Sequence, residues 1–159
     1  MAANNQDERP RSRMAGLIAG LAIAVGYLAF DVLETGDAGP LGTFGLPTVI
    51  AGSLGGWIFG PAARTSQTDR GWAGVIVGLA VTSVVIAAVV VGIQLGLAME
   101  TAPRGFETTF HAVLSMVSLT VLFGVPTFGL FMLPLTIAAS AIWALVMVFV
   151  RPGRSTTPG

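Results

Sequence analysis

The chain has 159 residues, 53% of them hydrophobic and 10% charged, and its formal net charge at pH 7 is zero. Soluble chains carry roughly 25% charged residues on average, and apolar runs of about 20 residues recur here, each long enough to cross the hydrocarbon core of a bilayer. An ordinary soluble domain is therefore excluded, and the composition predicts an all-α integral membrane protein with a single transmembrane domain. The alternating ten-residue strands of an outer-membrane barrel are absent.

Several kinds of chemistry are excluded by residues that the chain lacks. Without cysteine it has no disulfide, thiolate metal site or cysteine nucleophile. All eight basic residues are arginine, so a lysine-dependent Walker-A phosphate loop and Schiff-base catalysis are excluded as well. A single histidine cannot supply two-histidine haem or zinc ligation within one chain. We therefore predict that the protein is not an enzyme and that it binds no cofactor.

The predicted elements alternate polar segments with apolar spans. A polar head with three arginines opens the chain, and we predict it to be disordered and cytoplasmic. The apolar run after it continues to Phe30, so we interpret it as a retained span and not as a secretory signal peptide. Polar or Gly/Pro-rich turns follow each span. The predicted bounds are 1–13 for the head, 14–34, 42–62, 72–99 and 130–150 for four spans, 107–123 for an extra amphipathic helix, and 151–159 for a disordered tail.

The segment 107–123 leaves two topologies open. If it lies in the outer interface, the chain has four spans, and seven of the eight arginines face the cytoplasm, as the positive-inside tendency favours. If it crosses as a fifth span, for which it is apolar enough, Arg151 and Arg154 lie outside. The arginine distribution favours four spans with a cytoplasmic amino terminus, in a cell membrane of prokaryotic type.

Two stretches of the chain resemble two later ones. Residues 73–82 match residues 15–24 at six of ten positions, and residues 133–140 echo residues 46–53. Because the matches occur in the same order, they predict a bundle built from a tandem two-helix repeat. The alternative is an accidental match, which a chain so rich in Ala, Gly, Val and Leu readily produces.

Glycines recur every four residues in three of the predicted spans. Residues four apart lie on one face of a helix, and glycine there lets a second helix approach closely. The spacing predicts close helix packing within the chain or with another membrane protein. The residues predicted to pack in this way are Gly16 and Gly20 in the first span, Gly52, Gly56 and Gly60 in the second, and Gly74 and Gly78 in the third.

Acidic residues gather in the parts of the chain that are predicted to lie outside the cell. If the repeat pairs Glu34 with Glu100, the two carboxylates could hold a hard cation such as calcium or share a proton. The alternative is that they are solvated loop ends, since none falls at the centre of a span. The candidate metal ligands are Asp31, Glu34, Asp37, Glu100 and Glu107.

A polar stripe follows one face of the segment 107–123. It consists of Thr108, His111, Ser115 and Ser118. Glu107, His111 and Ser115 also have the order of an acid–base–nucleophile relay, but such relays usually draw their members from different elements. We therefore interpret the stripe as the polar face of an amphipathic helix.

Two functional classes remain open at this stage. The first is a structural or accessory membrane subunit that acts through glycine-mediated helix packing. The second is a small transporter or channel with an acidic cation site facing outward. A conduit needs polar or ionisable groups at mid-depth, whereas the spans offer only hydroxyl groups there and no charge at mid-span, so we favour the first class. The expected partners are the lipid bilayer and either a second copy or another membrane protein. Nucleic acid is not expected.

Overall fold

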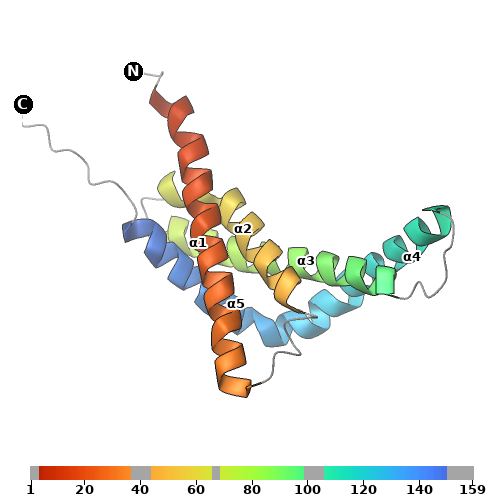
Figure 1. Cartoon of the computed structure of the whole chain (residues 1–159). Coiled ribbons are helices and arrows are strands. Elements are labelled where there is room, and N and C mark those ends of the chain that lie inside the picture. The colour runs from red at the N-terminus through yellow and green to blue at the C-terminus, as the bar shows by residue number, and fades with distance from the viewer. Residues whose placement is uncertain (1–3, 37–43, 66–68, 99–105, 150–159) are drawn as a thin grey trace, which may run out of the picture.

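Five helices make up the described part of the chain. The computed structural model describes residues 4–36, 44–65, 69–98 and 106–149, and no strand occurs in these ranges. The helices are α1 (Asn4–Thr35), α2 (Leu46–Thr65), α3 (Asp69–Ala98), α4 (Phe106–Leu119) and α5 (Val125–Phe149), and a π-helical turn, η2 (Thr120–Gly124), joins α4 to α5 (Figure 1). Five helical segments are long and apolar enough to cross a membrane, so the predicted all-α class is confirmed.

Helix α1 is longer than the predicted first span. We expected a disordered head up to residue 13, but the helix begins at Asn4. A physical reason lies in the sequence, because Asp7 and Glu8 fall near the helix start, where the helix dipole favours negative charge. Asp7 also precedes Arg11 by four residues, a spacing that stabilises a helix. The predicted tail 151–159 lies outside the described residues.

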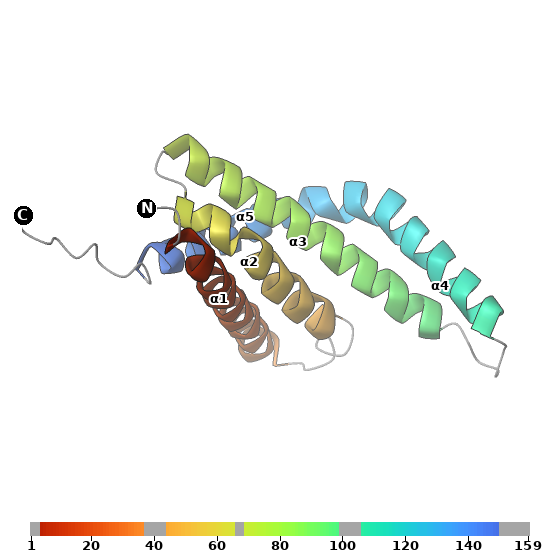
Figure 2. The same ribbon diagram turned by 90° about the horizontal axis from the view of Figure 1, so that it is seen from above.

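Neighbouring helices α1 and α2 run in opposite directions and lie against each other along most of their length (Figures 1 and 2). The start of α1 meets the end of α2, where Ser12 lies against Gly60. Further along, Gly20 lies against Gly52. Helix α3 then returns beside α2, so the first three helices form an up–down–up arrangement.

Helices α4 and α5 follow one another without a reversal of the chain. Residues 106–149 are helical throughout, and Figure 2 shows the run changing direction where α4 passes into α5. Helix α4 lies beside the second half of α3, where Gly96 meets Val113 and Gly92 meets Val117. Helix α5 continues along the first half of α3 and reaches α1 and α2 (Figure 2). The predicted helix 107–123 is thus the first part of a long bent helix.

The bend between α4 and α5 has an identifiable cause. The Val125 N–H bonds the Thr120 carbonyl, which is the five-residue spacing of a π-turn. Pro126 has no N–H to continue the ordinary helical ladder, and such sites kink helices. The Thr120 hydroxyl also donates to the Met116 carbonyl at 2.7 Å, so the backbone beside the turn has an additional partner. The turn changes the direction of the helix and does not end it.

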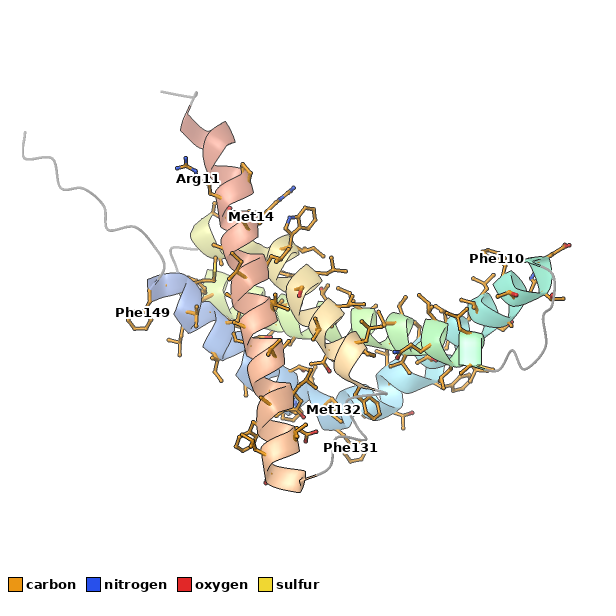
Figure 3. All side chains as sticks on the ribbon, viewed as in Figure 1. Arg11, Met14, Phe110, Phe131, Met132 and Phe149 are labelled. Carbon is orange, nitrogen blue, oxygen red and sulfur yellow. The ribbon has the colours of Figure 1, made fainter. Side chains whose placement is uncertain are left out.

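The buried core lies where α1, α2, α3 and α5 meet. It is built from small residues and one large one, Trp143, which is 2% exposed. Its buried members are Ala19, Ala63, Val75, Leu79, Trp143, Ala144 and Met147. Most other large apolar side chains are exposed, and Figure 3 shows Met14, Phe131 and Phe149 on the outside of the helices. An apolar surface of this extent is typical of a protein surrounded by lipid.

Candidate functional site: a glycine-packed helix interface

The contact between α1 and α2 is made by glycine backbones. The Gly16 backbone meets Gly56 and Gly60, and the Gly20 backbone meets Gly52. A Cβ placed on Gly52 would lie 2.8 Å from the Gly20 carbonyl oxygen, and one on Gly16 would lie 3.0 Å from the Gly60 Cα. Any side chain at these positions would therefore push the two helices apart. Five of the seven glycines selected from the sequence lie in this one contact.

Trp143 of α5 closes this contact from the side. Its indole Nε1 donates a buried hydrogen bond of 3.0 Å to the Gly16 carbonyl oxygen. The same nitrogen lies 3.1 Å from the position that a Cβ on Gly56 would occupy. Glycine at position 56 thus leaves room both for α1 and for the indole. A buried indole N–H needs an acceptor, and here it finds one on the backbone of another helix.

The two glycines of the third predicted span have different surroundings. A Cβ on Gly78 would lie 2.8 Å from the Phe59 ring of α2, so this glycine makes room for a side chain and not for a backbone. Gly74 is exposed, and no atom of the described chain lies within 4 Å of its Cβ position. A packing partner for Gly74 would have to come from outside the described residues.

These surroundings bear on the proposed repeat. Gly16 and Gly20 correspond to Gly74 and Gly78 in the two matching stretches. The first pair meets glycine backbones, whereas the second pair does not. The matching stretches are therefore packed differently, and the repeat stays a prediction from the sequence.

Sequence reasoning missed two glycines that pack closely. Gly92 and Gly96 have the same four-residue spacing, and each Cβ position lies 2.6 Å from a valine Cα of α4. They hold the second half of α3 against α4. Their spacing is visible in the sequence, but both glycines lie outside the stretch 73–82 that resembles residues 15–24.

The three acidic candidates in the described part of the chain do not form a cluster. Asp31 and Glu34 lie in the last turns of α1, and Glu107 lies in the first turn of α4, well away from them in both views (Figures 1 and 2). Asp37 and Glu100 lie outside the described residues. Within the described part of the chain, no group of three or more potential metal ligands occurs.

The polar stripe lies on the exposed side of α4. Thr108, His111, Ser115 and Ser118 are all exposed. Val113 and Val117, which meet α3, lie on the opposite side of the helix. The Glu107, His111 and Ser115 side chains accordingly sit on the open face of a single helix.

A cavity of about 220 Å³ lies between α3 and α5. Its lining is apolar: Val81, Val84, Val125, Pro126, Gly129, Leu130 and Leu133. Such a lining offers no polar group that could orient a charged substrate.

The arginines of the described helices gather at one end of the bundle. Because Ala15, Ala63, Trp72 and Met147 share one core cluster, the start of α1, the end of α2, the start of α3 and the end of α5 lie together. We call this the arginine end, and its described members are Arg11, Arg13 and Arg70, all exposed. Asp31 and Glu34 lie at the other end of α1.

Comparisons with protein-family models, curated proteins and solved structures found no match to this chain.

Proposed function

We propose that the protein is a structural or accessory subunit of a cell membrane, which acts by presenting a rigid, glycine-packed helix bundle to a second copy or to another membrane protein. The observation that carries this proposal is the contact between Gly16, Gly56 and Trp143. Backbone-to-backbone packing sealed by a buried indole leaves no space for a solute between α1, α2 and α5.

The polarity of the interior supports a structural role over conduction. Ser12 and Ser140 are the buried polar residues among those described, and the described cavity is apolar. Transport pathways are lined by polar or ionisable groups or by unpaired backbone at mid-depth. The separation of Asp31 and Glu34 from Glu107 gives no support to an acidic cation site. The transporter is therefore the less favoured alternative.

Four crossings agree best with the continuity of α4 and α5. A fifth crossing would require the chain to reverse between the segments Glu107–Thr127 and Gly129–Phe149, and the helical run contains a bend but no reversal. The end of α5 also lies at the arginine end, beside the start of α1. With the positive-inside tendency, both termini are then cytoplasmic.

A topology reporter tests this arrangement. A fluorescent protein that folds only in the cytoplasm, fused after Gly159, should give a signal equal to that of the same reporter fused before Met1. A dark carboxy-terminal fusion at normal expression, with a bright amino-terminal one, would mean an odd number of crossings.

Reconstitution and cross-linking test the role itself. Purified protein in liposomes should cause no ion or solute flux above that of empty liposomes. Amine-independent cross-linking in native membranes, at carboxylates or photo-reactive residues, should trap one discrete complex. Protein-dependent flux would favour the transporter, and a chain that stays monomeric in membranes would contradict a subunit role.

A further inference from the structure

Near the arginine end, an arginine of α1 lies on a tryptophan of α2. The Arg13 guanidinium carbon is 4.6 Å from the centroid of the Trp57 ring, over its face. Both side chains remain accessible, since Arg13 is exposed and Trp57 is 38% exposed. A cation–π contact of this kind requires no N–H donor, and Arg13 is exposed, so the guanidinium N–H groups stay available to a ligand.

Because α1 begins at Asn4, the charged positions of the polar head are divided between two sides of a helix. At about 100° per residue, positions 9 and 13 lie about 40° apart, on one face. Position 11 lies about 200° from position 13, and positions 7 and 8 are closer to it than to position 13. Figure 3 shows Arg11 on the side of α1 away from α2. The acidic residues Asp7 and Glu8 thus share the Arg11 side of the helix.

Helix α2 adds a further basic position to the face that bears Trp57. Arg64 follows Trp57 by seven residues, which are two turns of the same helix, so both positions lie on one face of α2. We use the name basic face for Arg13 and Trp57 at the arginine end of the α1–α2 pair, where positions 9 and 64 continue the same helix faces. Because residues 4–13 are helical, positions 9 and 13 lie on a different side of α1 from the two acidic positions.

We propose that the basic face binds the headgroup phosphate of an anionic phospholipid, with Arg13 as the principal ligand. A guanidinium matches a phosphate with two parallel N–H donors, and an indole is favoured at the level of the headgroups. The site rests on the proposed membrane location, because Arg13 lies at the start of the apolar segment Pro10–Glu34 and contacts Trp57 in the second half of Leu46–Ala63. The guanidinium therefore lies toward one boundary of the apolar region.

A titration of the purified full-length chain in detergent tests the site. Native mass spectrometry would follow the bound fraction as phosphatidylglycerol is added, with phosphatidylcholine of the same acyl chains as the zwitterionic comparison. Inorganic phosphate forms a separate arm, since it carries the shared chemistry without the lipid. Wild-type protein should bind phosphatidylglycerol more tightly than phosphatidylcholine, and inorganic phosphate should compete only weakly.

Arg13→Gln and Arg11→Gln make a matched pair. They remove the same charge two residues apart, but only Arg13 belongs to the basic face. Arg13→Gln should weaken phosphatidylglycerol binding about fivefold, which is what the attraction of one basic residue to an anionic surface corresponds to. Arg11→Gln should change it less than twofold. Trp57→Leu, which removes the platform and keeps every charge, should also weaken binding.

The possible results distinguish a specific phosphate site at the basic face from general electrostatic attraction of the lipid to arginine. Equal losses for the two arginine variants, or no loss with Trp57→Leu in protein that retains its helical circular dichroism, would overturn the proposal. Full competition by inorganic phosphate would identify a free-anion site. Because binding is measured in detergent without a partner, its failure would leave the subunit proposal, judged by flux and cross-linking, unaffected.

Discussion

The α1–α2 pair and the α3–α4 pair are both held by glycines four residues apart, yet they differ in what faces those glycines. In the first pair both helices contribute glycine, so backbone meets backbone. In the second pair Gly92 and Gly96 meet the Val117 and Val113 backbone of α4, so only one of the two helices contributes glycine. The first contact is also sealed by Trp143, whereas no residue of the segment Glu107–Thr127, which includes most of α4, is buried.

The difference indicates that the glycine spacing alone does not make a tight interface. Close approach also needs small residues at the facing positions of the partner helix, and a third helix that covers the contact. We therefore expect the α1–α2 contact to carry much of the stability, and the α3–α4 contact to be a local, more easily opened one.

The largest expected effect is that of Gly56→Leu. The new side chain would meet the Gly16 carbonyl and the Trp143 indole, neither of which can move without separating helices. We expect a loss of about 3 kcal/mol or more in the free energy of unfolding, at the upper end of overpacking effects. Thermal unfolding in detergent measures it.

Gly74→Leu is the matched control for this variant. It makes the same change in a helix, at a position with no described atom within 4 Å of the added Cβ. Its unfolding temperature should stay within a few degrees of wild type. Equal losses at the two positions would mean that leucine disturbs these helices regardless of packing, and the comparison would fail.

Trp143→Phe should have an intermediate effect. The variant removes the hydrogen bond to Gly16 and part of the buried ring, while the Gly16 carbonyl keeps its bond within α1. We expect a loss of about 1 to 2 kcal/mol, the sum of one net hydrogen bond and a small cavity. The same change at the half-exposed Trp57 should cost less. A larger loss at Trp57 would contradict the role given to Trp143 as the seal.

Much of the fold follows from the sequence, because hydropathy and glycine spacing report local properties. Apolar length identified the helices, and the four-residue spacing selected the residues that line the α1–α2 contact. The direction of α4 relative to α5 could not be obtained in this way. Gly124, Pro126 and Gly129 predict an interruption, but whether a break bends a helix or reverses it depends on the hydrogen bonds formed around it.

The candidate site was less predictable than the fold. Trp143 looked like any other packing tryptophan, since the partner of its N–H is a backbone atom more than a hundred residues away. The acidic candidates were chosen by sequence position alone. Which carboxylates lie together depends on where several helix ends are placed. Asp31 and Glu34 lie at the end of α1, well away from the start of α4, which carries Glu107 (Figure 1).

Among the closely packed positions, Gly96→Leu should have the smallest effect, and it sharpens the comparison most. The leucine would displace Val113 of α4, but α4 can move outward because its other side is exposed. We expect a loss of about 1 kcal/mol, at the low end of overpacking, since little buried surface depends on this contact. Hydrogen–deuterium exchange should quicken in α4 and stay unchanged in α1 and α2, because local opening does not require the whole bundle to unfold. A loss as large as that of Gly56→Leu, with faster exchange in every helix, would show instead that both glycine contacts belong to one cooperative core.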